Sequence, residues 1–401
     1  MGKLDEIRAL LGAKLKEKKS ETFSFGSAYN ISEVPKIIEK KNKDWVYWGE
    51  DNLYPLKLKD MKTASAIHNA IVKTKTKLTA GDGLLINGAT NEQTSKANYQ
   101  ALDVKTKAAF DYVTKNEQGD MSLDEIMRNL ANDLQTYGCY AYSRVYNNDF
   151  TKQYKIKYYP VFKIRAAKKE DGKVQKYYFH EDWTQEKKQG FEPSVIFAYD
   201  KNDKENYEQL VFRKIGDLEY YGEPSYSGAL TWIQTDFQMG LFHLSNITNG
   251  MNPGMHFSFY KLPSSEDDKE RILEDLQRTY MGAQQAGRFI TTFSNGKELA
   301  PDIKAIETSN LDKQLITLAE LCDKKILSGH QLTSPLLVGI SVSGQLGGNT
   351  ELQIAYQIFD NVIMGSDRNM MDKDLQFIYG LNVPNVTVEI NPFNPFKVRP
   401  Q

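Results

Sequence analysis

In the first third of the chain, apolar residues recur mostly at helical spacing. Residues 1–24 combine such a stretch with basic residues and predict a terminal arm (Leu4, Ile7, Leu10 and Leu11, then Lys14, Lys16, Lys18 and Lys19). A helix is expected over about residues 58–78, because Gly81-Asp82-Gly83 follows it. Ser122 and Glu125 have the spacing of a capping box, which predicts another helix that ends at Gly138.

The pattern changes to strand-like alternation between residues 140 and 221. Apolar and polar residues alternate in 154–158 and 161–165, and Asp171-Gly172 is typical of a hairpin turn. Helices followed by an antiparallel sheet therefore predict one α+β unit over residues 25–222.

From residue 223 the pattern predicts two long helices around a small mixed unit. The first helix, over residues 223–249, has apolar residues on more than one face, so it is either buried all round or packed against other copies. Residues 250–308 predict a strand, a helix and a strand, and a second long helix is expected over residues 309–332.

The last quarter of the chain begins with an uncharged, Gly- and Ser-rich stretch. Residues 333–350 predict a loop, and a third long helix is expected over residues 351–380. Residues 381–401 contain one alternating strand at 386–390 and a tail with Pro and Phe.

Composition narrows the possible functions. The 401 residues are 40% hydrophobic and 26% charged, as in a globular protein, and their number suffices for two or three folding units. The 11% of aromatic residues favours a protein that associates with others. A formal net charge of −1 argues against a basic nucleic-acid coat. The sequence has neither an apolar run of about 18 residues nor a signal-peptide core, so we expect an intracellular product without a membrane partner.

The residues that could carry chemistry do not form a recognisable site. The glycine-rich stretch at 339–350 lacks the lysine of a phosphate-binding P-loop, and Cys139 and Cys322 lie far apart in the sequence. The histidines lack metal-ligand spacing and are expected to be isolated structural or surface residues (His68, His180, His243, His256 and His330). We therefore expect no enzyme activity, no catalytic residue, no metal and no cofactor.

Several short motifs occur in a fixed order between residues 140 and 380. They are Tyr221-Gly222-x-Pro224-x-Tyr226-x2-Ala229, Asn249-Gly250-x2-Pro253-Gly254, Gly282-x3-Ala286-Gly287-Arg288, Pro335-Leu336-Leu337-x-Gly339 and Asn349-Thr350-Glu351. In this order the motifs resemble those of the portal proteins of tailed bacteriophages. The stretch Trp48-Gly-Glu-Asp-Asn-Leu-Tyr-Pro55 resembles the N-terminal region of some prophage-type portals.

The resemblance implies an α+β portal fold that assembles into a ring of about twelve copies. It assigns a wing to residues 25–222 and the terminal strand, and a stem to the two long helices. The clip would be residues 250–308, and the tunnel loop 333–350 would precede the tunnel helix. Few residues follow the tunnel helix, so a C-terminal crown is expected to be short or absent.

The implied function is a head–tail connector in the virion, at one vertex of the capsid. Double-stranded DNA would pass through its channel during packaging and ejection. Its expected partners are other copies of itself, the terminase large subunit, the major capsid and scaffolding proteins and the head–tail adaptor. Assembly would take place in the cytoplasm of the host cell.

The resemblance also selects two sets of candidate residues. Those of the tunnel loop would line the DNA channel, with Gln345 and Leu346 at its narrowest part (Ser341, Ser343, Gly344, Gln345, Leu346, Gly347, Gly348 and Asn349). Those of the clip would dock the motor and later the adaptor (Glu266, Asp267, Asp268, Lys269, Arg271 and Arg278). The alternatives are a non-enzymatic oligomeric scaffold or adaptor, and an unrecognised nucleic-acid enzyme.

Overall fold

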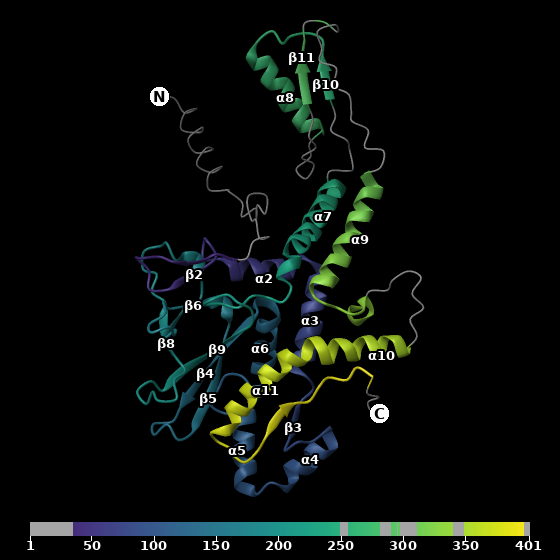
Figure 1. The fold of residues 1–401 in the computed structure, drawn as a ribbon. Coiled ribbons are helices and arrows are strands. Elements are labelled where there is room, and N and C mark those ends of the chain that lie inside the picture. Colours follow the sequence, from purple (N-terminus) through teal and green to yellow (C-terminus); the bar gives the residue numbers. More distant parts are fainter. Residues whose placement is uncertain are drawn as a thin grey trace. The chain divides into compact units, whose positions relative to one another are not determined.

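The computed structural model describes residues 35–248, 256–280, 290–294, 296, 311–339 and 349–396 (Figure 1). Contacts divide the chain into the units Met1–Val34 and Pro35–Gln401, and every described residue belongs to the second unit. The arm predicted at residues 1–24 lies outside the described residues.

The N-terminal part of the second unit contains short strands and five helices. In chain order these elements are β1 (Ile37–Glu39), β2 (Val46–Trp48), α2 (Tyr54–Ala64), α3 (Ala66–Ala80), β3 (Leu84–Ile86), α4 (Glu92–Ala101), α5 (Val104–Lys115) and α6 (Leu123–Tyr137). The capping box of α6 is present, with Ser122 and Glu125 each bonded to the other's backbone, and Gly138 ends the helix in the left-handed region.

A six-stranded mixed sheet follows. Its strands are β4 (Cys139–Tyr146), β5 (Gln153–Tyr159), β6 (Ile164–Ala166), β7 (Lys176–Phe179), β8 (Ser194–Ala198) and β9 (Glu208–Lys214), in the spatial order β5-β4-β9-β8-β7-β6. The predicted hairpin joins β6 to β7, and Asp171 and Gly172 both have positive φ, as a tight turn requires. One pairing departs from the antiparallel prediction: β8 runs parallel to β9, because the long connection between them brings the chain back in the same direction.

The C-terminal half of the chain is mainly helical. Its elements are α7 (Leu230–Thr248), β10 (His256–Phe259), α8 (Glu266–Tyr280), β11 (Ile290–Phe293), α9 (Leu311–Gly329), α10 (Asn349–Ile358), α11 (Gly365–Gly380) and β12 (Val388–Ile390). β10 and β11 pair in parallel, and β12 pairs with β3 rather than with the large sheet. α10 and α11 are joined by a π-helical segment, Phe359–Met364.

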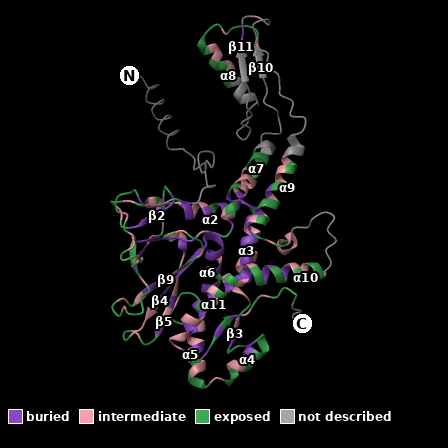
Figure 2. Cartoon of the chain, viewed as in Figure 1, coloured by how far each residue is buried: buried purple, intermediate pink, exposed green. Residues whose placement is uncertain are grey.

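The main core lies between α6, the sheet and α11. Leu130 and Leu134 of α6 are buried with Tyr140 of β4 and Leu375 of α11. Figure 2 shows buried residues along α3 and α6, in contrast to the largely exposed α10. A smaller aromatic cluster packs β2 against β7 around Trp45.

The helix expected over residues 58–78 is two helices. Ser65 has an extended backbone and its side chain accepts a hydrogen bond from the backbone N–H of His68, so it ends α2 and caps α3. The third long helix, expected over residues 351–380, is interrupted by the π-helical segment.

Candidate functional site

The two long helices α7 and α9 pack along each other (Figure 1). Ile233 of α7 and Cys322 and Ile326 of α9 are fully buried between them and their neighbours. Other apolar side chains of the pair remain exposed, as the sequence pattern on more than one face had indicated (Leu241, Phe242 and Leu244 of α7, Ile316 and Leu321 of α9). The pair therefore has apolar surface available for another protein.

The start of α7 and the end of α9 meet at a close helix–turn contact. The 3-10 turn Ser227–Ala229 precedes α7, and a Cβ added to Gly329 would lie 2.3 Å from the Cβ of Ala229. A residue larger than glycine at position 329 would push the two segments apart.

A buried histidine pair lies beside this contact. Nδ1 of His68, on α3, is 2.8 Å from Nε2 of His330, which follows α9. The ring of Tyr226 packs against both imidazoles, with centroid distances of 4.5 and 4.8 Å. Sequence spacing gave no sign of this pair, because 262 positions separate its members. The expectation of isolated histidines is therefore wrong for His68 and His330.

The electrostatics of the pair favour two neutral imidazoles. Burial, together with the nearby charges of Lys62 and Lys75, lowers the pKa of His68 to about 3. Burial also lowers the pKa of His330 well below its usual range. Nε2 of His68 and Nδ1 of His330 have no hydrogen-bond partner among the described residues.

Lys75 ties α3 to the chain just before α7. It is 1% exposed, its Nζ donates to the Ser225 hydroxyl over 2.9 Å, and burial lowers its pKa to about 8. Tyr226 donates to the backbone carbonyl of Thr136 on α6 over 2.7 Å. The helical pair is therefore anchored at this end by buried polar contacts to α3 and α6.

Most of the predicted clip-docking residues lie on the first turns of α8. The Ser265 hydroxyl accepts from the backbone N–H of Asp268, and Lys269 pairs with Glu266 over 2.6 Å. Glu266, Asp267 and Arg271 are exposed, whereas Asp268 and Lys269 are half-buried. Arg278 belongs to α8, but its side chain lies outside the described set.

All but one of the predicted tunnel-loop residues lie outside the described residues. Residues 340–348 lie outside the described residues, and Asn349 is the first residue of α10. α10 is tied to the preceding segment by Thr333, whose hydroxyl donates to the backbone carbonyl of Ala355 over 2.7 Å. Ile354 and Ile358 of α10 are about half exposed.

The joint between α10 and α11 contains a buried ion pair. The Arg368 guanidinium contacts both carboxylate oxygens of Asp360, one of them at 3.4 Å, and it donates to the backbone carbonyl of Leu78 over 3.0 Å. This pair connects the π-helical segment to α3 and α11.

Within the described ranges, no group of three or more His, Cys, Asp or Glu residues could hold a metal ion. Burial raises the pKa of the Cys139 and Cys322 thiols, which makes both poor nucleophiles. No described helix is long and apolar enough to cross a membrane.

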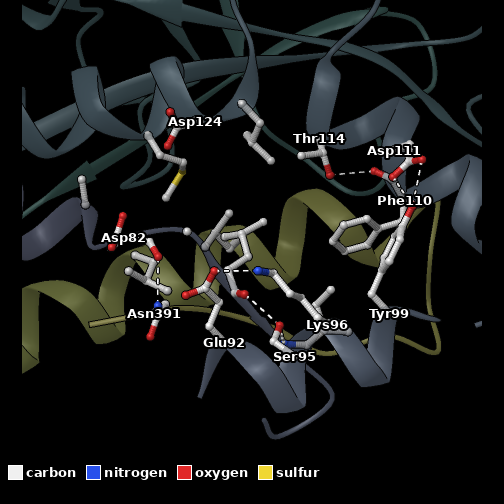
Figure 3. A pocket seen from close by; sticks show the side chains of 18 of the residues that line it. Asp82, Glu92, Ser95, Lys96, Tyr99, Phe110, Asp111, Thr114, Asp124 and Asn391 are labelled. Atoms are coloured by element: carbon white, nitrogen blue, oxygen red, sulfur yellow. Dashed lines mark hydrogen bonds and ion pairs between the residues drawn. The ribbon is translucent and has the colours of Figure 1, made fainter. Parts of the chain in front are cut away.

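An apolar cavity of about 500 Å³ lies beneath α4, between that helix and α5, α6, β3 and β12. Figure 3 shows four acidic residues around it, Asp82, Glu92, Asp111 and Asp124. The sequence pattern had not indicated this cavity.

Comparison with known proteins supports the fold class. No family model and no curated protein sequence matches the chain. Among solved structures, a chain from "Neck of empty GTA particle computed with C6 symmetry" aligns with a TM-score of 0.53 and 13% identity, over 86% of this chain and 85% of that one. Chains from "Virion of native gene transfer agent (GTA) particle" and "Neck of native GTA particle computed with C12 symmetry" align with TM-scores of 0.52, at 12% and 11% identity, over 92% of this chain and 88% of theirs.

The chain therefore has a mixed helix-and-sheet fold shared with neck and virion components of phage-like particles. At the level of the fold, this confirms the resemblance to a portal-type protein that the motifs had indicated.

Proposed function

We propose that the chain is a portal-type head–tail connector of a phage-like particle. It assembles into a ring of about twelve copies at one capsid vertex, and double-stranded DNA moves through the ring during packaging and ejection. The ring first docks the terminase large subunit and later the head–tail adaptor, and it contacts capsid and scaffolding proteins. The protein is assembled in the host cytoplasm and resides in the virion.

The observation that carries this proposal is the fold shared with neck chains over most of both lengths. One of these necks is described with C12 symmetry, which fits a ring of about twelve copies. The domain assignment goes with the same proposal: a wing (25–222), a stem (223–249 and 309–332), a clip (250–308) and a tunnel loop (333–350).

The exposed apolar side chains of α7 and α9 support a ring independently of the comparison. Ile316 is 61% and Leu244 60% exposed. Such side chains on adjacent helices lose contact with water when copies pack side by side. A closed ring covers them in every copy and leaves no free edge.

The channel proposal rests on composition. The residues from Ser341 to Gly348 carry no charge, so phosphates can pass them without strong counterion-releasing contacts. The clip proposal rests on the exposed acidic turn of α8 and on a segment, 251–307, with nine acidic and seven basic residues. A mixed, mildly acidic surface suits partners that are exchanged.

Mass photometry and negative-stain microscopy of the purified full chain test the proposal. We expect ring particles with a central hole and about twelve times the 45.8 kDa mass of one chain. The measurement is repeated at micromolar concentration with the scaffolding protein added. A chain that stays a stable monomer or dimer in that sample would contradict the proposal.

A further inference from the structure

The cavity beneath α4 has the size and lining of a binding site. Its volume of about 500 Å³ lies within the range of about 300–1,000 Å³ that is usual for ligand pockets. Its walls include side chains of the main core (Ile86, Phe110, Leu123, Met127, Leu375 and Ile390). An apolar group that enters it gains contacts with side chains that have no partner on that side.

The mouth of the cavity is acidic. Asp82, Glu92, Asp111 and Asp124 line it together with one basic residue, Lys96, which pairs with Glu92 over 3.0 Å. Asp111 accepts a hydrogen bond from the hydroxyl of Tyr99 over 2.8 Å (Figure 3). Asp124 also pairs with Arg128 over 2.8 Å. The four acids and two bases give a local charge of −2, which favours an occupant with cationic groups next to an apolar anchor.

One side of the cavity is lined by α4, which is held by polar contacts and by the ring of Tyr99 against Phe110. The Ser95 hydroxyl donates to the backbone carbonyl of Leu84 and accepts from the backbone N–H of Ile86. Ser95 is the one buried residue of α4. Because no apolar residue of α4 is fully buried, the helix can shift at a lower cost than the core helices to admit an occupant.

The chain itself contains a segment with the required chemistry. Residues 1–20 place Leu4, Ile7, Leu10 and Leu11 at the spacing of one helical face. The same residues hold six basic and three acidic side chains, a charge of +3, and four of the bases follow directly after the apolar group. The segment thus matches the cavity in both polarity and charge.

We propose that residues 1–20 of a neighbouring copy dock in this cavity. The inference rests on the proposed ring and names a contact that would hold it together. A segment on one copy and a cavity on the next make a head-to-tail contact, which is the type that closes into rings. The residues between Leu11 and Pro35 can span about 80 Å when extended, at 3.3–3.6 Å per residue, so their length permits docking on an adjacent copy.

Cross-linking between two differently tagged full-length chains tests the contact. One chain carries Ile7→Cys and the other carries Gln100→Cys on the cavity wall, and the two are assembled together before treatment with a short bismaleimide. Cys139 and Cys322 are both fully buried, so the native thiols do not compete. We expect a cross-linked dimer that contains both tags. In the control, Lys201→Cys replaces Gln100→Cys. Lys201 lies on the loop between β8 and β9, so this dimer should not form.

Two variants of the cavity sharpen the test. Leu84→Trp fills the cavity, and Asp82→Lys changes only the charge at its mouth. We expect each to reduce the yield of the cross-linked dimer at least severalfold, and the effect of Asp82→Lys to shrink as salt is added. Leu84→Trp could reduce the cross-link by disturbing the fold. Asp82→Lys leaves the core side chains unchanged, so a loss of the cross-link in that variant reports on docking itself.

Ring formation is measured on the same samples by mass photometry. Rings without the mixed cross-link overturn the docking but leave the proposed function standing. A third sample is a single chain that carries both Ile7→Cys and Gln100→Cys. If only this chain forms the cross-link, the segment docks in the cavity of its own copy, and docking on a neighbouring copy is ruled out. Absence of rings under all conditions overturns the proposed function, and the docking contact with it.

Discussion

Nδ1 of His68 and Nε2 of His330 lie 2.8 Å apart in a site from which water is excluded. One ring must donate the shared hydrogen, and the outer nitrogen of each ring has no partner among the described residues. The contact joins α3 to the end of α9 as long as one of the two facing nitrogens can accept, and it is lost when both rings are protonated. Protonation of either ring would place a cation next to Lys62 and Lys75 in a buried site.

This pair is expected to make the protein acid-sensitive. The pKa of His68 is about 3 in the folded protein against 6.5 for a free histidine. The unfolded chain therefore binds the proton first, and stability is lost as pH falls from about 6.5 toward 3. At pH 5 the loss from His68 amounts to about 2 kcal/mol.

The double variant His68→Leu/His330→Leu removes this titration without leaving an unpaired polar partner. Urea denaturation at pH 7 and pH 5 should show a smaller drop in the free energy of unfolding for the variant than for the native chain. The comparison is needed because carboxylates titrate in the same range; burial raises the pKa of Asp133, for example, to about 7. Equal drops for the two proteins would argue against the pair as the acid-sensitive element.

Gly222 belongs to one of the portal-like motifs, and the structure gives a physical reason for it. A Cβ at this position would lie 2.2 Å from the backbone oxygen of Gly138. Gly222→Ala should therefore destabilise the chain by about 1–3 kcal/mol, as overpacking typically does. Gly228→Ala is the matched control, because nothing lies within 4 Å of its added Cβ. Thermal unfolding of both variants distinguishes them, and equal midpoints would contradict the steric argument.

Local sequence signals predicted the elements whose causes are themselves local. The capping box of Ser122 and Glu125 and the turn at Asp171-Gly172 are both present, because each depends on backbone preferences within a few residues. The break at Ser65 was missed, although Ser is a common N-cap, because apolar residues continue at helical spacing on both sides of it. α4 was missed for the opposite reason: it buries only Ser95 and has almost no apolar periodicity.

Contacts between distant residues could not be predicted in this way. His68 and His330, Lys75 and Ser225, and the walls of the cavity beneath α4 come together only when the chain is folded. A single sequence contains no spacing rule for such pairs. The motifs did indicate the shared fold. Their order can be read along the sequence without knowing which residues are in contact.

The Asp360–Arg368 ion pair is expected to be necessary for the joint between α10 and α11. Both side chains are about 10% exposed. Removing one partner leaves a buried charge, so Arg368→Met should cost about 3–5 kcal/mol. The double variant Asp360→Leu/Arg368→Met should recover most of that loss in chemical denaturation. A double variant as unstable as the single one would show that the bond from Arg368 to Leu78, rather than the ion pair, dominates.

The acidic turn of α8 is expected to contribute to docking of the terminase large subunit. Glu266→Gln/Asp267→Asn neutralises two exposed charges and keeps the Ser265 cap. We expect roughly two- to fivefold weaker binding for each charge that faces a cation, since exposed pairs contribute up to about 1 kcal/mol. Glu274→Gln, which is also exposed on α8, is the control. A pull-down with purified terminase that gives the same binding for all three proteins would count against this surface.

The exposed apolar side chains of the helical pair should decide whether rings form. Ile316→Glu places a charge at a position that is 61% exposed in the single chain, so the fold of one copy should be retained. Between copies the same charge would be buried without a partner, at a cost of several kcal/mol per interface. We therefore expect mass photometry to show monomers for Ile316→Glu, with an unchanged circular dichroism spectrum. Val104→Glu, the same type of change at a position of α5 that is 85% exposed, should leave rings intact. Rings with Ile316→Glu would show that this face of α9 does not lie between copies.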